Sequence, residues 1–196
     1  MIPLSAAPLA YSLIVITVAL SLFALMVDNK FYEDNLFHVG AILDAKQFHR
    51  MITSGFLHVD NGHLLMNMLT LYFFGPLLEY KLGTLGFAII YFGSLFIASL
   101  LPLYTKRDQP TYRAVGASGA ISGVLLSFCL FEPFSMLYLF FAIPIPAVLF
   151  AVGYIAYSTM AMKGPSHIGH DAHLGGAIGG IILTLILVPD VVTRFF

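Results

Sequence analysis

Two side chains that could act as a catalytic pair, Ser118 and His173, lie far apart in the sequence. Ser118 belongs to the run Gly116-Ala117-Ser118-Gly119, at the start of an apolar segment that ends near Phe131. A serine hydroxyl becomes a nucleophile when a neighbouring base accepts its proton, and histidine is the most common base in proteins. These residue types therefore predict a serine–histidine dyad if the fold brings positions 118 and 173 together.

Two further polar residues are suited to stabilising an oxyanion. His63 and Asn67 are four positions apart, so they share one face of a helix. Both side chains can donate a hydrogen bond to developing negative charge, beside the backbone N–H of Ser118. A third catalytic member is not evident, because Asp171 is two positions from His173 and points to a different helix face. The residues thus predict a dyad with an oxyanion hole.

The composition defines the kind of fold that must position these residues. Hydrophobic residues make up 59% of the chain and charged residues 10%, and the mean hydropathy is +0.92. A soluble domain carries about 25% charged residues, so this chain is predicted to be an integral membrane protein in contact with the lipid bilayer. The net charge is −1 and there is no basic run, which argues against nucleic acid as a partner. The single cysteine excludes an intrachain disulfide.

Six apolar segments are predicted to cross the bilayer as helices, each of which needs roughly 20 residues. They cover residues 8–27, 63–81, 85–103, 114–131, 144–162 and 169–188. The first has a long apolar run with no Lys or Arg before it, so we interpret it as a transmembrane helix and not as a cleaved signal peptide. The chain is therefore predicted to form one domain, residues 1–196, with an all-α, six-transmembrane-helix fold.

The connections between the spans carry weaker signals. Residues 28–62 are rich in charge, and residues 44–54 within them favour a short helix at the membrane surface. Asn61 is the expected N-cap of the second span. Because proline breaks helices, the fifth span is expected to begin near Pro144, which leaves residues 134–142 as a buried connector or an extra turn.

The direction of the spans brings the polar residues to one depth. Consecutive spans alternate in direction, so the second, fourth and sixth enter the membrane from the same side. His63, Asn67, Ser118 and His173 all lie in the first turns of these three spans. Polar residues within a membrane tend to face the interior of the bundle and to mark function, so the four are expected to converge.

Small residues favour a close approach between the fourth and sixth spans. Gly119 and Gly123 flank the serine face of the fourth span, and Gly176 and Gly180 share the face of His173 on the sixth. Glycines at such spacing let two helix backbones touch. This packing would bring the serine within hydrogen-bond reach of the histidine.

At these residues the chain resembles the rhomboid intramembrane serine proteases, over nearly its whole length. Four motifs carry the resemblance, and together, in this order, they are highly specific. They are His58, His63 and Asn67 at the spacing His-x-x-x-x-His-x-x-x-Asn; Gly75, Glu79 and Gly83 as Gly-x-x-x-Glu-x-x-x-Gly; Gly116-Ala117-Ser118-Gly119 as Gly-x-Ser-Gly; and Ala172-His173-Leu174-Gly175-Gly176 as Ala-His-x-x-Gly.

The resemblance implies a six-helix bundle of rhomboid type around a water-filled cavity, with no cofactor and no metal. In it Ser118 attacks the scissile carbonyl, His173 transfers the proton, and the oxyanion is held by His63 and Asn67. The implied substrates are membrane proteins whose transmembrane helix unwinds near a small residue, because only an unwound peptide bond is accessible. The resemblance also implies that Glu79 helps to hold the 28–62 loop, and that the fifth span and residues 163–168 serve as gate and cap.

The chain departs from the family pattern in three respects. Many members have Trp-Arg in the first loop, where this chain has His49-Arg50 and no tryptophan at all. Some have an aromatic residue four positions after the nucleophile that stacks on the base; Ser122 stands here, so the base is expected to be oriented in another way. The usual bacterial topology implies a multi-pass inner-membrane protein whose active site opens to the extracytoplasmic side, whereas most Lys and Arg residues lie in odd-numbered loops and favour the opposite orientation.

Other interpretations stay open from the residues alone. Ser118 is compatible with a packing serine at a helix interface. A catalytically inactive relative that binds membrane clients would have the same fold. His167, His170 and His173 are spaced by three, which allows a metalloenzyme or a metal transporter, although they lack the His-Glu-x-x-His signature.

Overall fold

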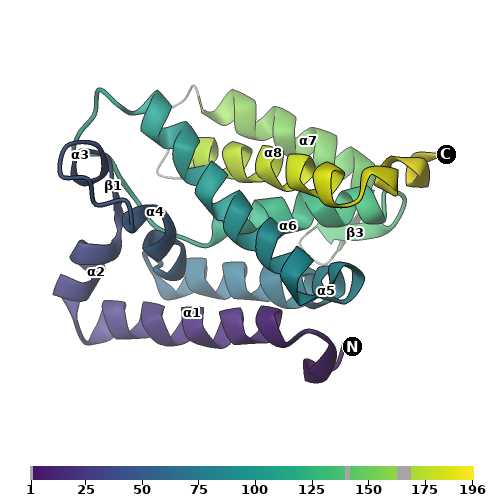
Figure 1. Cartoon of the computed structure of the whole chain (residues 1–196), viewed down its shortest axis with the longest axis horizontal. Helices are drawn as coiled ribbons and strands as arrows, with labels where there is room; N and C mark the ends of the chain where they lie inside the picture. Colours follow the sequence, from purple (N-terminus) through teal and green to yellow (C-terminus); the bar gives the residue numbers. More distant parts are fainter. Residues whose placement is uncertain (1, 140–141, 163–168) are drawn as a thin grey trace.

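The computed structural model describes residues 2–139, 142–162 and 169–196, which form a bundle of helices (Figure 1). The long helices are α1 (Pro8–Met26), α5 (Asn61–Thr105), α6 (Ser118–Phe131), α7 (Ala147–Ala161) and α8 (His170–Leu187). Shorter helices between α1 and α5 are α2 (Asn29–Asn35), α3 (Val39–Leu43) and α4 (Arg50–Thr53). The strands are β1 (Phe37–His38), β2 (Arg113–Ala114), β3 (Met136–Leu139) and β4 (Ile143–Pro146), and 3-10 turns cover Leu4–Ala6, Ser54–Phe56 and Pro189–Phe195.

α5 consists of two membrane helices that meet at Gly83. This residue has φ 71° and ψ 166°, a conformation that glycine adopts most readily and that interrupts the helix. α1, α5 and α8 are long and apolar enough to cross a membrane, and α6 and α7 are shorter apolar helices. With α5 counted as two, the described residues contain the six membrane helices that the sequence predicts. Gly75 lets α1 approach α5, because a Cβ there would lie 3.3 Å from that of Ala10.

α6 lies at the centre of the bundle, packed against both α5 and α8, and nearly all of its residues are buried. A Cβ added at Gly176 would lie 1.9 Å from the carbonyl oxygen of Gly119, and one at Gly180 would lie 2.3 Å from that of Gly123. The backbones of α6 and α8 therefore touch along this line, which glycine alone permits. The predicted close approach of the fourth and sixth spans is confirmed.

A two-stranded sheet connects the first loop to the segment before α6. β1 and β2 are antiparallel, with Phe37 opposite Ala114 and His38 opposite Arg113. Because residues 113–114 are held extended by this pairing, α6 begins at Ser118 and not at residue 114, where the sequence predicts the start of the span. The nucleophile candidate is thus the first residue of its helix.

Arg50 organises the first loop from inside. Its side chain is buried and donates hydrogen bonds to the carbonyl oxygens of Glu33, at 2.7 Å, and Leu36, at 2.9 Å. It also donates to Oε1 of Gln47 at 2.6 Å. A buried guanidinium needs several acceptors, and these three fold the loop around it. The short helix predicted within residues 44–54 is present as α4, followed by a 3-10 turn.

Three sequence predictions about the connections are wrong. Asp60, not Asn61, caps α5, because its Oδ1 accepts the N–H of His63 at 2.7 Å. α7 begins at Ala147, because the two prolines expected at its start lie in β4. The described part of 134–142 is neither a buried connector nor a helical turn; it contains β3, whose side chains are largely exposed.

Glu79 holds the beginning of α1. Its carboxylate is buried and accepts hydrogen bonds from the backbone N–H groups of Leu9, at 3.1 Å, and Ala10, at 2.7 Å. The Thr84 hydroxyl donates a third bond at 2.8 Å. N–H groups in the first turn of a helix have no partner within it, and the helix dipole favours an anion there. Glu79 therefore joins α5 to α1, and not to residues 28–62 as the resemblance implied.

Candidate active site

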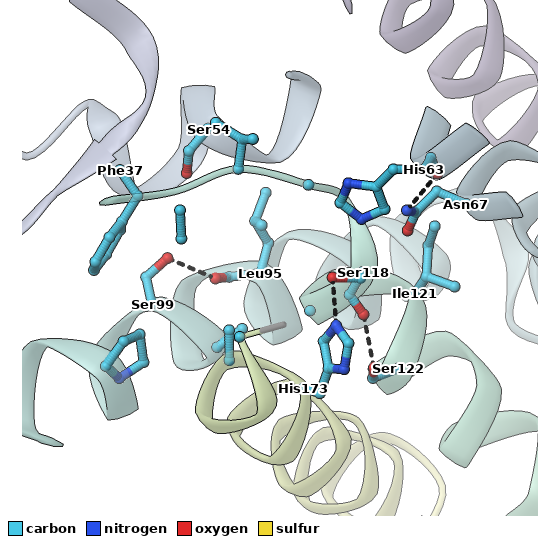
Figure 2. Close-up of a pocket in the computed structure, with 18 of the residues that line it drawn as sticks. Phe37, Ser54, His63, Asn67, Leu95, Ser99, Ser118, Ile121, Ser122 and His173 are labelled. Carbon is cyan, nitrogen blue, oxygen red and sulfur yellow. Dashed lines mark hydrogen bonds between the residues drawn. The ribbon is translucent and has the colours of Figure 1, made fainter. Parts of the chain in front are cut away.

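Ser118 and His173 are hydrogen-bonded to each other. Oγ of Ser118 lies 2.7 Å from Nε2 of His173 (Figure 2). Ser118 is the first residue of α6 and His173 lies in the first turn of α8, so the contact forms at one end of the bundle. The structure thus brings the two residues together as the direction of the spans predicts, and the glycine contacts between α6 and α8 hold them at this distance.

The beginning of α6 supplies backbone donors beside the Ser118 hydroxyl. The N–H of Ile121 bonds to the carbonyl oxygen of Ala117 at 3.0 Å, which starts the helical pattern. The N–H groups of Ser118 and Gly119 precede it, so they have no acceptor within the helix. The dipole of α6 adds partial positive charge at this end. Negative charge that develops next to Ser118 is therefore stabilised by the helix itself.

Gly116 shapes the turn that leads into α6. Its φ is 135°, a conformation that other residues rarely adopt, and its N–H donates to the carbonyl oxygen of Ser54 at 3.0 Å. A Cβ at this position would lie 2.7 Å from Cε1 of His63. Glycine is therefore required twice, once for the backbone and once so that the His63 ring can lie against the turn before the nucleophile.

His58 supports the same turn from the side of α1. Its Nε2 accepts the N–H of Ala117 at 3.4 Å, and its Nδ1 lies 2.8 Å from Oγ of Ser21. Because Nε2 is an acceptor, Nδ1 carries the proton. Burial lowers the pKa of His58 to about 3, so the neutral ring keeps its bond to Ala117 near neutral pH. His58 is therefore a structural support for the turn.

His63 and Asn67 line the same cavity as the dyad. In Figure 2 the His63 and His173 rings lie on opposite sides of Ser118. Nδ2 of Asn67 donates to the His63 carbonyl oxygen at 2.9 Å, which fixes the amide, and the NH₂ group has a second N–H to donate. All four polar residues predicted to converge thus lie around one cavity.

The ring of His173 packs against His170, not against position 122. The two ring centroids are 5.9 Å apart with the planes at 86°. Tyr157 of α7 packs against His170 in the same way, with centroids 5.4 Å apart at 87°. Edge-to-face contacts of this kind are favourable between aromatic rings. They give the base an orientation that does not depend on an aromatic residue at position 122.

Tyr154 is a site residue that the sequence does not single out. Its hydroxyl lies 2.5 Å from Oγ of Ser122, which in turn donates to the carbonyl oxygen of Ser118 at 2.7 Å. The chain of bonds links α7 to the first turn of α6. Aromatic residues are common in the apolar segments, so the only signal in the sequence is a phenolic hydroxyl within a span, which needs a polar partner.

Asp171 does not belong to the catalytic pair, as its position in the sequence predicts. Its Oδ2 accepts the hydroxyl of Thr105 at 2.9 Å, and its Oδ1 accepts the N–H of Ala172 at 2.9 Å. The carboxylate thus connects the end of α5 to the beginning of α8, where the helix dipole favours an anion. Its role is to fix the start of the helix that carries His173.

A cavity of about 900 Å³ leads from the dyad to the surface near β1 and β2. Its volume is near the upper end of the usual range for ligand sites, roughly 300–1,000 Å³. Tyr154 lines it on one side, while Glu33 and Arg113, which form an ion pair at 2.8 Å, line its outer part. The dyad is therefore accessible to a ligand of peptide size.

The structure offers little for the metal interpretation within the residues it describes. Among residues 2–139, 142–162 and 169–196, no three His, Cys, Asp or Glu side chains are grouped to hold a metal ion. His170 and His173 pack ring against ring. His167 lies outside the described residues, as does the cap expected at 163–168.

Comparisons with known proteins agree with the geometry. The Rhomboid domain model matches residues 45–190, a range that contains all four motifs. The mitochondrial RHOMBOID-like protein 12 of Arabidopsis thaliana is 35% identical over 147 residues, which cover 67% of this chain and 44% of that protein. The mitochondrial Rhomboid protein 1 of Saccharomyces cerevisiae is 36% identical over 140 residues, covering 67% and 40%. YdcA of Bacillus subtilis is 31% identical over 146 residues, covering 74% and 70%.

This chain belongs to the rhomboid family. It is a multi-pass membrane protein with the six-helix bundle of a rhomboid, and it spans less than half the length of the two mitochondrial relatives. Both relatives are named as mitochondrial proteins, which conflicts with the bacterial inner membrane expected from the sequence. The prediction of an integral membrane protein is confirmed, and the prediction of a bacterial inner membrane is withdrawn.

Proposed function

We propose that this rhomboid is an intramembrane serine endopeptidase that cleaves membrane proteins within an unwound transmembrane segment. The observation that carries the proposal is the 2.7 Å contact between Ser118 Oγ and His173 Nε2 in a cavity of about 900 Å³. A serine that only packs between helices needs neither a histidine at hydrogen-bond distance nor a cavity that leads to it. Family membership supports the same class of reaction.

In the first half of the reaction, Nε2 of His173 accepts the hydroxyl proton while Oγ of Ser118 attacks the scissile carbonyl carbon. Negative charge then forms on the carbonyl oxygen. The N–H of Ser118 at the start of α6 stabilises it, together with His63 and Asn67 from the opposite wall of the cavity. His173 next gives its proton to the leaving amine, so the peptide bond breaks and an ester to Ser118 remains.

In the second half, water replaces the amine in the cavity. His173 takes a proton from the water as its oxygen attacks the ester carbon, and the same oxyanion donors act again. Collapse of the intermediate returns the proton to Oγ of Ser118 and releases a carboxylate. Ser118 and His173 together supply every proton donor and acceptor that this cycle requires. The reaction therefore needs no third, acidic catalytic residue.

The substrate class follows from the depth of the site. Peptide bonds within a transmembrane helix are protected by their own hydrogen bonds, and only an unwound segment can reach Ser118. We assign α7 as the gate through which such a segment enters, because Tyr154 of α7 lines the cavity and bonds to α6 beside the dyad. The dyad is proposed to open to the extracytoplasmic side, with residues 28–62 above it.

Cleavage of a single-span substrate by the purified protein in detergent tests the proposal. Ser118→Ala and His173→Ala are expected to lower the rate by about 10³-fold or more, because the two residues act as a unit. Ser127→Ala is the matched control, since Ser127 is a buried serine of the same helix that bonds to α8 away from the dyad. Cleavage that survives Ser118→Ala would contradict the assignment. A wild-type protein that binds substrates and never cleaves them would instead be a catalytically inactive, client-binding rhomboid.

A further inference from the structure

The connection between α6 and α7 is an antiparallel hairpin that the proposed reaction does not use. In it Met136 of β3 pairs with Pro146 of β4, and Tyr138 pairs with Pro144. Figure 1 shows β3 at the end of the bundle that carries both termini, away from β1 and α3. The hairpin therefore lies at the end opposite the dyad, on the other side of the membrane-spanning bundle.

The hairpin packs on the protein at its base and exposes apolar side chains elsewhere, on both of its faces. Side chains alternate between the two faces of a strand. Leu137 packs against the core cluster of α6 that contains Leu125 and Leu126. Met136 and Tyr138, on the other face, are 53% and 63% exposed. The hairpin is thus fixed to the bundle while it presents apolar side chains outward.

The outer edge of β4 has no N–H donors. The N–H of Ala147 bonds to the carbonyl oxygen of Ser135 at 2.9 Å, so every second residue back along β4 also faces β3. Pro144 and Pro146 are the residues between, and they face away. Proline has no N–H, so this edge avoids the cost of several kcal/mol that an unpaired donor pays in lipid. The same prolines prevent a strand of a second copy from pairing with this edge.

The outer edge of β3 indicates how deep the hairpin lies in the bilayer. Met136 and Tyr138 face away from β4, and their N–H groups need water or lipid headgroups. Tyrosine itself is enriched at membrane interfaces, because its ring is apolar and its hydroxyl is wet. The hairpin therefore fits the boundary between headgroups and acyl chains, with its proline edge toward the acyl chains.

The length of α7 leaves room for the hairpin in the membrane. Fifteen residues of helix are about 22 Å long, roughly 8 Å less than the hydrocarbon core of a bilayer. Exposed apolar side chains continue from the hairpin into α7, where Leu149 is 61% and Val152 is 64% exposed. The hairpin and α7 together complete the apolar height that α7 alone lacks.

We propose that the β3–β4 hairpin is a lipid-binding element, which lies in the bilayer interface of the leaflet opposite the dyad and anchors the base of α7. Its partner is the bilayer and not another protein. The anchor holds the N-terminal end of α7, so the C-terminal half of this helix, where Tyr157 packs against His170, is the part left to move.

The chain contains no tryptophan, so a single introduced tryptophan reports on one position. We would place Tyr138→Trp in liposomes and compare quenching by lipids brominated near the headgroup, by lipids brominated near the chain end, and by aqueous acrylamide. Emission is expected to fall about twofold with the shallow bromines and less with the deep ones, with weak acrylamide quenching, as for an interfacial aromatic. Phe134→Trp, 64% exposed beside β3, is the second reporter if the first variant does not fold.

Two reference variants calibrate the depth. Val15→Trp lies near the middle of α1, where Val15 is 66% exposed, and is expected to respond more to the deep bromines. Asp108→Trp lies in the polar loop after α5, where the Asp108 side chain is 91% exposed, and is expected to respond to acrylamide. If Tyr138→Trp is quenched by acrylamide as strongly as Asp108→Trp, the hairpin lies in water and the proposal is wrong. If no quencher reaches it, a protein surface such as a second copy covers it, and the proposal is also wrong.

Discussion

Gly176→Ala would disturb the dyad without touching it. The added Cβ would lie 1.9 Å from the carbonyl oxygen of Gly119, whereas ordinary contacts begin near 3.4 Å. Both atoms belong to rigid helix backbone, so neither can turn aside as a flexible side chain would. The helices α6 and α8 must therefore separate by about 1.5 Å at this point, since close-packed interiors do not absorb such an overlap.

The separation reaches the dyad because His173 is one helical turn from Gly176. If α8 moves as a unit, the distance from His173 Nε2 to Ser118 Oγ rises from 2.7 Å to roughly 4 Å, which is too long for a hydrogen bond. A misplacement of about 1 Å costs on the order of 10²-fold in rate. Overpacking of the helix contact is expected to cost a further 1–3 kcal/mol or so in stability.

The assay measures cleavage of a single-span substrate and thermal unfolding for wild type, Gly176→Ala and Gly153→Ala. Gly153 is the matched control, because it lies within α7 and a Cβ there meets nothing within 4 Å. Gly153→Ala is expected to keep its activity and to be up to about 1 kcal/mol more stable, since alanine favours a helix. If the folded Gly176→Ala protein cleaves as fast as wild type, the α6–α8 contact does not position the dyad.

Three further predictions follow from single contacts. Glu79→Ala leaves two N–H groups of the first turn of α1 unpaired and is expected to lower the free energy of unfolding by about 3–5 kcal/mol. Thr84→Ala removes only one donor to the carboxylate and should cost about 1 kcal/mol. Equal losses for the two variants would refute the capping role of Glu79. The pKa of His58 is about 3 in the folded chain and 6.5 ordinarily, so below pH 6.5 only the unfolded chain takes up this proton. Stability is therefore expected to fall through this window, by about 2 kcal/mol near pH 5, and His58→Ala should flatten that part of a thermal-unfolding profile; an unchanged profile would contradict the neutral buried ring. Tyr154→Phe removes the hydrogen bond to Ser122 and is expected to change the cleavage rate several-fold. The free energy of unfolding should change by only about 1 kcal/mol, the value of one neutral hydrogen bond. A wild-type cleavage rate would show that the bond between α7 and α6 has no effect on catalysis.

The convergence at the dyad could be predicted because few polar residues lie within the spans. Ser118 is the first residue of the fourth membrane helix and His173 lies in the first turn of the sixth, and alternation of direction alone sets them at one depth. The four-residue spacing of Gly119 and Gly123 on one span, and of Gly176 and Gly180 on the other, added the reason for close contact. The structure shows the two backbones touching at these glycines. Because helices that cross a membrane must alternate in direction, the number of spans alone shows which helix ends lie on the same side.

The parts that could not be predicted depend on partners distant in the sequence. A buried acid such as Glu79 demands donors, but its sequence neighbours do not show that these lie at the start of α1. β1 and β2 are two residues each, too short for a periodic signal, and exist only because they pair with each other. Tyr154 is one of many aromatic residues in apolar segments, and only its contact with Ser122 distinguishes it.

The most direct test of the central claim is covalent labelling by a fluorophosphonate, with the modified residue located by mass spectrometry. Ser118 is expected to be the labelled residue in the wild-type protein, and Ser118→Ala to remain unlabelled. His173→Ala, if folded, should label at least about 10²-fold more slowly, because its serine has lost the base. Label on another residue, or an equal labelling rate in His173→Ala, would contradict a Ser118–His173 dyad.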